Sequence, residues 1–309
     1  MSIYFGTPRF FQGDFKTLEA IKKEGLVMSE PVKTEKWGYQ GNCISTLPNC
    51  DMALKVIDVP LLEKVDYIYY HSCFPQNHNC GCLGTVAPRY PMEDFIDYSV
   101  AKILMRFHGM DIPFCGITQR GCSGIFQCMS LAKGALRLHS DMRSIYCISC
   151  DKIPENCYYD RPRQQLLMSD SACSLVVSKQ KMEYELIGDE SYTILKDNTL
   201  LIVRKFVELI QKALLKASIG IEEVENLFVP NFWEYHWNRI VSYFKLDASK
   251  LIRGSTIETL AHGFSADFLS NLALYEKNGW LTHQKYQIAI GYGYGNHLNC
   301  ILFKKVLEN

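Results

Sequence analysis

The chain has 309 residues, a length that suits two halves of similar size or one large α/β unit and that can bury a substantial core. Its 33 Lys and Arg residues balance 33 Asp and Glu residues, and the zero net charge excludes a diffuse basic surface for nucleic acid or an anionic membrane. With 48% hydrophobic and 21% charged residues, the composition excludes a disordered chain and is typical of a compact globular protein.

The 13 cysteines are the unusual part of this composition. An odd number cannot all pair, and a chain of this length does not depend on disulfides. The first residues lack a basic stretch followed by an apolar one, and no apolar run reaches the ~18 residues that a membrane helix needs. We therefore expect a cytoplasmic protein with mostly reduced cysteines and with neither a membrane nor a nucleic acid as partner.

Short apolar runs alternate with segments of helical period through the first half, and this alternation predicts a layered α/β arrangement. In chain order we expect a strand at 67–70, a helix at 92–109, a strand at 112–118, a helix at 123–139, and strands at 145–149 and 174–178. Residues 152–169 contain two prolines and several charges and are expected to form a long surface loop.

The second half repeats the alternation. We expect a helix at 200–217 ended by Gly220, a strand at 227–229 stopped by Pro230, an aromatic-rich helix at 233–244, a helix within 257–278, and strands at 286–290 and 298–303. The sequence contains no short repeat, so a duplicated architecture is expected only in the order of the elements.

The sharpest candidate for chemistry is Cys122, in the segment Thr-Gln-Arg-Gly-Cys-Ser-Gly at 118–124. A predicted strand runs directly into a predicted helix there, so the thiol faces unpaired N–H groups and the positive end of the helix dipole. Such surroundings lower a cysteine pKa to roughly 3.5–7.5. A turn of this kind presents a nucleophile to a thioester while its own N–H holds the oxyanion. The alternative is a buried cysteine on a glycine-rich turn.

The other cysteines are weaker candidates for a chemical role. Cys147 and Cys150 form a C-x-x-C pair but lie in an apolar predicted strand, where packing is expected rather than redox chemistry. A second group has residue types that bind zinc but lacks the spaced pair that would complete a tetrahedral site; it comprises His71, Cys73, His78, Cys80 and Cys82. We expect no metal, and a redox or metal-binding protein is the weaker alternative.

Five motifs, in order, carry a resemblance to a known family. They are Gly-Cys-Ser-Gly at 121–124, Leu-Met-Ser-Asp-Ser-Ala-Cys-Ser-Leu-Val-Val at 167–177, the stretch from Val-Pro-Asn to Arg-Ile at 229–240, Ala-His-Gly-Phe-Ser-Ala-Asp at 261–267 and Gly-Tyr-Gly-Tyr-Gly at 291–295. From about residue 60 to its end, the chain resembles β-ketoacyl-acyl-carrier-protein synthase III and its relatives in the thiolase superfamily.

The resemblance implies a thiolase fold, an α/β arrangement in which two duplicated βαβαβ halves form α-β-α-β-α layers. Residues 1–180 would carry the nucleophile, and residues 181–309 would carry the acid/base and glycine-turn motifs. Cys122 matches the cysteine that takes an acyl group, and the backbone N–H groups of Cys122 and Tyr294 would form the oxyanion hole. The resemblance further implies acyl-CoA or acyl-carrier protein as partner, a CoA or phosphopantetheine thioester as substrate with no other cofactor, and a homodimer or a heterodimer with a related synthase.

The sequence departs from the condensing members of this family at two positions. A histidine after Val-Pro and an asparagine after the later glycine are replaced here by Asn231 and Phe264. Because loss of such donors costs about 10²-fold or more in rate, we do not expect efficient decarboxylative condensation. Some acyl-transferring relatives carry instead a histidine and a downstream aspartate, and His262 and Asp267 resemble that pair.

We therefore predict acyl transfer from a CoA or acyl-carrier-protein thioester, through a Cys122 acyl-enzyme, to an amine, hydroxyl or carbon nucleophile in lipid, polyketide or specialised-metabolite biosynthesis. His262 or Asp267 would serve as base, with Asn231 and His236 as substitute bases or supporting groups. The alternative is a catalytically silent subunit of a heterodimeric synthase. The missing His/Asn pair favours that alternative, and the intact cysteine turn opposes it.

Overall fold

The computed structural model describes residues 1–74, 103–104, 110–154, 157–195, 198–253 and 257–306. The helix expected at 92–109 therefore lies outside the described residues, apart from 103–104. None of the described helices is long and apolar enough to cross a membrane.

An 11-stranded sheet runs through both halves of the chain. The strands of the first half are β1 (Tyr4–Phe5), β2 (Arg9–Gln12), β5 (Tyr67–His71), β6 (Phe114–Ile117), β7 (Ser144–Asp151) and β10 (Ser171–Ser178). Those of the second half are β11 (Tyr184–Thr193), β12 (Val224–Phe228), β13 (Leu251–Ile252), β14 (Tyr286–Gly293) and β15 (His297–Lys305). Along the sheet the order is β13-β12-β14-β15-β11-β1-β10-β7-β5-β6, and β2 pairs with β10.

The two halves use their strands in the same way. With β2 set aside, each half has five strands, which we number by their order along the chain. From the outer edge of the sheet to its centre, both halves then show the order third, second, fourth, fifth and first. In both, the second strand is parallel to the third and fourth, and the remaining pairs are antiparallel. The expected duplication of strand order is therefore confirmed. The predicted boundary at 180/181 falls between β10 and β11, while β1 of the first half pairs directly with β11.

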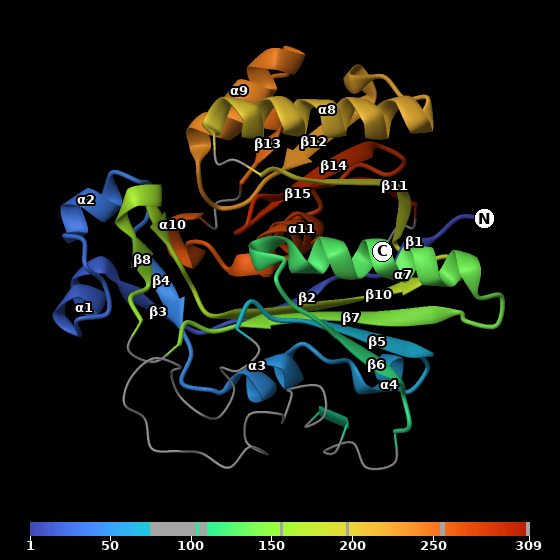
Figure 1. Ribbon diagram of the computed structural model, residues 1–309, viewed down its shortest axis with the longest axis horizontal. Coiled ribbons are helices and arrows are strands. Elements are labelled where there is room, and N and C mark those ends of the chain that lie inside the picture. The colour runs from blue at the N-terminus through green and yellow to red at the C-terminus, as the bar shows by residue number, and fades with distance from the viewer. Residues whose placement is uncertain (75–102, 105–109, 155–156, 196–197, 254–256, 307–309) are drawn as a thin grey trace.

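The helices complete five layers, as Figure 1 shows. Helices α8 (Thr199–Ala217) and α9 (Glu234–Phe244) cover the outer face of the C-terminal strands, and α3 (Asn49–Lys55) and α4 (Val59–Leu62) cover that of the N-terminal strands. Helices α7 (Gly124–Leu138) and α11 (Asp267–Lys277) lie between the two sets of strands. This arrangement confirms the expected α-β-α-β-α layering.

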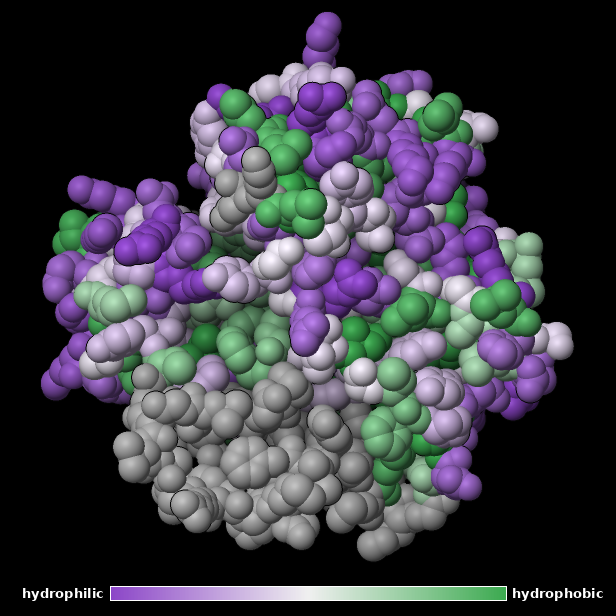
Figure 2. All heavy atoms as spheres, viewed as in Figure 1, coloured by the Kyte–Doolittle hydropathy of each residue, from purple (hydrophilic) through white to green (hydrophobic). Residues whose placement is uncertain are grey.

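The apolar pattern explains the central elements. Every residue of β10, and all but the first of β7, is buried, as expected for strands covered on both faces. Helix α8 is amphipathic, and Figure 2 shows hydrophilic side chains over this part of the surface. Its first turn is capped by Asn198, whose side chain accepts the Leu201 N–H at 3.1 Å. The helix ends in a left-handed residue at Ser218 (φ 57°), so the expectation that Gly220 ends it was wrong.

Several short elements escape prediction from the sequence. The N-terminal region adds β3 (Asp14–Thr17), α1 (Leu18–Lys23), α2 (Pro31–Glu35) and β4 (Gly41–Ile44). The segment expected as a loop at 152–169 contains a small ribbon of β8 (Asp160–Arg161) and β9 (Leu166–Leu167) around the turn η2 (Pro162–Gln164). Short turns and one short helix complete the second half: η3 (Ile221–Glu223), η4 (Ala248–Lys250), α10 (Ile257–Leu260) and η5 (Phe264–Ala266).

Candidate active site

Cys122 lies on a sharp turn between β6 and α7, residues 119–124, termed the elbow. A 3₁₀ turn, η1 (Gly121–Ser123), leads into the helix, and the Ser123 hydroxyl donates to the Arg120 carbonyl at 2.8 Å. Gly121 has a φ of +51°, and a Cβ placed on it would lie 2.3 Å from the backbone nitrogen of Tyr294. Glycine is therefore required at 121 for both conformation and space.

The glycine turn at 291–295 packs backbone to backbone against the elbow. A Cβ placed on Gly293 would lie 1.9 Å from the Arg120 carbonyl oxygen, so this close approach of the two backbones requires glycine at 293. This contact brings the Tyr294 backbone nitrogen to the turn that carries Cys122. The Tyr294 side chain is exposed, and the Arg161 guanidinium lies 4.4 Å from the centre of its ring. The two predicted oxyanion groups thus belong to adjoining turns, and their catalytic role stays a prediction.

His262 and Asp267 form a buried pair. The His262 Nδ1 lies 2.5 Å from the Asp267 Oδ2, and both side chains are at most 5% exposed. The Asp267 carboxylate also accepts the Gly263 N–H at 2.7 Å and the Asn231 N–H at 2.8 Å. Asp267 is the first residue of α11, where the positive end of the helix dipole favours a carboxylate. The aspartate is therefore held in place to orient the imidazole and to stabilise its protonated form.

The Cys122 and His262 side chains shift each other's titration. A hydrogen bond from the Cys73 thiol and the charge of His262 lower the pKa of Cys122 to about 5, although burial raises it. Burial lowers the pKa of His262, but the charges of Asp267 and Cys122 outweigh it and raise that pKa to about 10. Among the described residues, the His262 Nε2 has no nitrogen or oxygen partner, so this atom is available to interact with the Cys122 thiol. Both shifts favour the thiolate form of Cys122 and the imidazolium form of His262.

Asn231 supports this pair and is not itself a base. Its Nδ2 donates to the Ala261 carbonyl at 3.1 Å, and its Oδ1 accepts a hydrogen bond from Asn271 at 3.1 Å. Its backbone N–H holds Asp267, as described above. A carboxamide is not a base at physiological pH, so Asn231 is unsuited to serve as a substitute base. Its role as a supporting group stays a prediction.

His236 is not brought to Cys122. Its ring stacks on Trp233 with centroids 4.6 Å apart, and both residues line a separate hollow of about 750 Å³. Ring contacts continue from Trp233 to Phe232 and from Phe232 to His262. His236 is thus linked to the pair only through two aromatic rings, and it lines a different cavity from Cys122. The arrangement gives no support to His236 as a substitute base, and that role stays a prediction.

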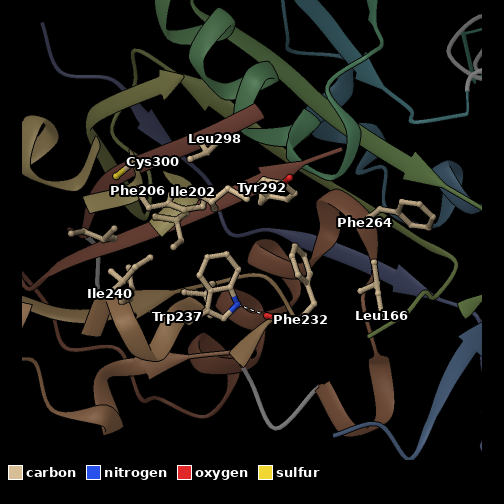
Figure 3. Close-up of a cluster of buried hydrophobic side chains, with 14 of the residues drawn as sticks. Leu166, Ile202, Phe206, Phe232, Trp237, Ile240, Phe264, Tyr292, Leu298 and Cys300 are labelled. Atoms are coloured by element: carbon tan, nitrogen blue, oxygen red, sulfur yellow. Dashed lines mark hydrogen bonds between the residues drawn. The ribbon is translucent and has the colours of Figure 1, made fainter. Parts of the chain in front are cut away.

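A second cavity, of about 390 Å³, opens beside Cys122. Its lining is mostly apolar and includes Phe74, Ile153, Leu166, Met168 and Phe264. Phe264 and Phe74 meet edge to face with ring centroids 5.8 Å apart. Figure 3 places Phe264 and Leu166 together at one end of a buried hydrophobic cluster, away from Trp237 and Ile240. The Phe264 ring therefore lines the cavity beside Cys122, at the position where the sequence resemblance implied an asparagine in condensing members.

Two further side chains lie at the site: Cys73, which the sequence analysis considered only as a zinc-type residue, and Asp151, which it did not consider. Cys73 lines the same cavity as Cys122, and the buried Asp151 accepts the Cys73 N–H at 2.5 Å. Both residues lie where parallel strands end, β5 for Cys73 and β7 for Asp151. The carboxyl ends of neighbouring parallel strands meet at one edge and commonly carry binding residues, and that rule was the available signal.

The remaining cysteines show neither disulfide nor metal chemistry within the described part of the chain. The described cysteines form no disulfide with one another, and no group of three or more His, Cys, Asp or Glu side chains converges there as metal ligands. Cys147 and Cys150 are buried in β7, and burial raises the pKa of both thiols. His78, Cys80 and Cys82, which belong to the zinc-type group, lie outside the described residues.

Comparison with known proteins finds matches among solved structures but none among sequences. No protein-family model and no curated protein sequence matches the chain. Among solved structures, the acyltransferase ChlB3 superposes with a TM-score of 0.78 at 16% identity, covering 99% of this chain and 98% of that chain. A 3-oxoacyl-[acyl-carrier-protein] synthase III from Aquifex aeolicus VF5 gives 0.78 at 16% identity, covering 98% and 99%. The chain has the thiolase fold.

A third thiolase-fold structure is more distant but was solved with ligands. It is OleA from Xanthomonas campestris with bound lauric acid and lauroyl-CoA, which superposes with a TM-score of 0.69 at 14% identity and 99% coverage of both chains. The resemblance inferred from the five motifs is thus confirmed at the level of the fold. At such low identity the thiolase fold alone carries over, so the reaction has to be argued from the site.

Proposed function

We propose that this thiolase-fold protein is an acyltransferase that carries its acyl group on Cys122. The observation that carries the proposal is the Cys122–His262–Asp267 array, in which a thiol of lowered pKa faces an imidazole fixed by a buried carboxylate. A thiolate is the reactive form of cysteine, and a positioned histidine can move the protons that acyl transfer requires.

In the first half-reaction, the Cys122 thiolate attacks the carbonyl carbon of an acyl thioester. The oxyanion that forms would accept hydrogen bonds from the Cys122 and Tyr294 backbone N–H groups. The bond from the acyl carbon to the carrier sulfur then breaks. The carrier leaves with that electron pair and takes the Nε2 proton of His262, so that it departs as a thiol and no further cofactor is needed.

In the second half-reaction, an amine, hydroxyl or acidic carbon acceptor attacks the acyl-enzyme. Its proton passes to the neutral His262 Nε2, and Asp267 stabilises the imidazolium that results. The bond from the acyl carbon to the Cys122 Sγ breaks, and the sulfur leaves as thiolate. The site then holds the same ion pair as at the start.

The two hollows suit the two ends of an acyl thioester. The apolar 390 Å³ cavity beside Cys122 would take the acyl chain. The 750 Å³ hollow has Lys36 and Arg163 for phosphate groups and the indoles of Trp37 and Trp233 for an adenine ring, and these features favour CoA or a phosphopantetheine carrier. The lauroyl-CoA seen in OleA is consistent with this assignment.

Transfer is favoured over decarboxylative condensation because the groups that would stabilise an enolate are absent from their expected positions. Asn231 is engaged with Ala261 and Asn271, and Phe264 presents a hydrocarbon ring to the cavity. As the resemblance implies, we propose that the protein works as a dimer.

The first test is acylation followed by intact mass spectrometry. Wild-type protein incubated with acetyl-, octanoyl- or lauroyl-CoA, or with the matching acyl-carrier proteins, is expected to gain one acyl mass on Cys122. Cys122→Ala is expected to gain none, and Cys115→Ala, which changes an exposed cysteine of β6, is the matched control. Absence of any adduct, or an adduct that survives Cys122→Ala, would overturn the proposal and favour the silent-subunit alternative. Native mass of the same samples reports the homodimer or a heterodimeric partner.

A further inference from the structure

Three segments of the first half converge on the Cys122 sulfur. Strands β5 and β7 run parallel with His71 opposite Ser149, and β5 and β6 run parallel with His71 opposite Ile117. Their carboxyl ends therefore meet at one edge of the sheet. Cys73 follows β5, Asp151 ends β7, and the elbow follows β6. Residues of its own half thus lie at the strand edge beside Cys122, in addition to the His262–Asp267 pair of the other half.

The contacts between these residues are specific. The Asp151 Oδ1 accepts the Cys73 N–H at 2.5 Å and the Ser72 hydroxyl at 3.2 Å, so the carboxyl fixes the backbone that carries the Cys73 thiol. The Asp151 Oδ2 is buried and has no nitrogen or oxygen partner among the described residues. The Cys73 and Cys122 side chains line the same cavity, and hydrogen bonding between the two thiols raises the pKa of Cys73 and lowers that of Cys122. A polar chain therefore runs from Asp151 through Cys73 to Cys122.

We propose that Cys73 and Asp151 form a second hydrogen-bonding arm on the Cys122 sulfur, distinct from the His262–Asp267 arm, and that this arm stabilises the sulfur as the acyl-enzyme breaks down. Cys73 touches the reacting atom and is thereby a further catalytic residue, whereas Asp151 acts through Cys73 and is a positioning residue. The assignment rests on the proposed acyl-enzyme and adds a group that its mechanism does not use.

The protonation of Asp151 sets whether the arm is available. Because a thiol has one proton, Cys73 donates either to the Cys122 thiolate or to an ionised Asp151. A protonated Asp151 instead donates to the Cys73 sulfur and leaves the Cys73 proton for Cys122. Burial raises the pKa of Asp151 to about 7, although the Cys73 N–H opposes this rise. The arm is therefore complete below about pH 7 and weakens above it.

The other ionisable groups at this edge do not replace Asp151 in this role. The thiols of Cys150 and Cys173 are buried, and burial raises their pKa values, so both are uncharged. Burial lowers the pKa of His71 to about 3, so this imidazole, which packs against Gly124, is neutral. His262 is already paired with Asp267 through its Nδ1. The Arg161 guanidinium stacks on the ring of Tyr294, and both residues line the cavity.

The arm has opposite effects on the two half-reactions. A hydrogen bond to the Cys122 thiolate makes it a weaker nucleophile toward the incoming thioester. When the acceptor attacks the acyl-enzyme, the bond from the acyl carbon to the Cys122 Sγ breaks and the electron pair moves to that sulfur. The Cys73 S–H then donates to the forming thiolate and eases its departure, while the acceptor's proton goes to His262. Removal of the Cys73 proton donor should therefore slow deacylation more than acylation.

The pKa of Cys122 gives a test that needs no acyl substrate. Iodoacetamide alkylation of the Cys122 peptide is followed by mass spectrometry against pH in wild type, Cys73→Val and Cys73→Ser. Valine removes the donor, and we expect the pKa of Cys122 to rise by about one to two pH units, the effect of one hydrogen bond to a charged group. Serine keeps a donor and is expected to keep the low pKa. Cys115→Val, on the neighbouring strand, is the control.

An unchanged Cys122 pKa in Cys73→Val, or an equal rise in the valine and serine variants, would overturn the assignment of Cys73. Asp151→Asn tests the rest of the arm, because asparagine keeps an acceptor for the Cys73 N–H and carries a permanent donor. Single-turnover deacylation in wild type is expected to slow above about pH 7, and this inflection is expected to vanish in Asp151→Asn. An inflection that persists would remove Asp151 from the proposal. If no acyl adduct forms at all, the proposed function fails, while the alkylation result still stands for or against Cys73.

Discussion

At the scale of residues, the site depends on what surrounds one thiol among many. Most described cysteines are buried in strands or helices, where burial raises the thiol pKa, as it does for Cys128, Cys147 and Cys300. Cys122 differs because hydrogen-bond donors and a positive charge reach it despite its burial. The count of cysteines in the sequence therefore carries little functional information, and the position of one at a strand-to-helix turn carries most of it.

The His262–Asp267 pair couples stability to pH in a definite direction. The pKa of His262 is raised from about 6.5 in the unfolded chain to about 10 in the fold. The pair's contribution is therefore complete below pH ~6.5 and is lost as the pH rises through about 10. Asp267→Asn removes the charge, and we expect the stability difference from wild type to be largest near pH 6 and to shrink toward pH 10. Urea unfolding at intervals across that range measures it, and a difference independent of pH would contradict the coupling.

The same variant should also lose activity. Loss of the aspartate of a catalytic triad lowers turnover by roughly 10²- to 10⁴-fold, since the imidazole is no longer held or charged correctly. Single-turnover acyl transfer at pH 7 measures the effect. Asp189, on β11, forms a salt bridge with Lys133 of α7. Asp189→Asn is therefore a control for removing a carboxylate away from the site.

At the scale of elements, the sequence predicts those that are long and buried. β7 and β10 are apolar along their length, and α7 and α8 show clear helical periods. β11 was not predicted, because its polar residues and the register shift between Leu186 and Gly188 obscure the alternation of apolar and polar side chains. The elements before residue 60 have two to seven residues each, too few to show a period.

Some residues of the candidate site can likewise be predicted from local sequence, whereas others cannot. Cys122 is predictable from its turn, and His262 and Asp267 from a motif of neighbouring residues. Cys73 and Asp151 are 78 positions apart in the chain and meet only because β5 and β7 pair in parallel. That pairing is a property of the sheet, which no local pattern in the sequence records.

Two glycines of α7 give a test of how tightly the elbow is held. Gly124 has helical dihedral angles, but a Cβ there would lie 2.0 Å from the His71 ring, whereas a Cβ on Gly134 would meet no atom within 4 Å. Gly134→Ala is expected to stabilise the protein by about 1 kcal/mol through helix propensity. Gly124→Ala should destabilise it by about 1–3 kcal/mol through overpacking and should slow acylation of Cys122. Thermal or urea unfolding of both variants decides this, and equal effects would show that the contact with His71 is easily relieved.

At the scale of the whole molecule, the two halves share one sheet and one aromatic junction. β1 pairs with β11, and Phe5 stacks on Tyr184 at 4.9 Å while meeting Phe303 at 5.5 Å. Each of these three side chains is fully buried. The halves are therefore expected to unfold together, although their strand orders are the same.

Phe5→Ala tests the junction. Loss of a buried phenyl ring costs about 3–5 kcal/mol, and the cost should appear in both halves because the ring joins them. Pulsed alkylation in increasing urea follows Cys147 in the first half and Cys300 in the second, since both are buried in the folded chain. We expect their midpoints to coincide in wild type and to fall together in Phe5→Ala. Midpoints that separate would show two units of independent stability.

The two central helices also begin alike, each after a short 3₁₀ turn, η1 before α7 and η5 before α11. The turns meet, with the Gly124 N–H donating to the Ser265 hydroxyl oxygen at 3.0 Å. One start carries Cys122, and the other carries Asp267 with His262 just ahead of it. The proposed nucleophile thus lies at one helix start, and its proposed proton carrier lies just ahead of the other. The proposed chemistry therefore needs both halves of the chain, because its groups come together only where the two helix starts meet.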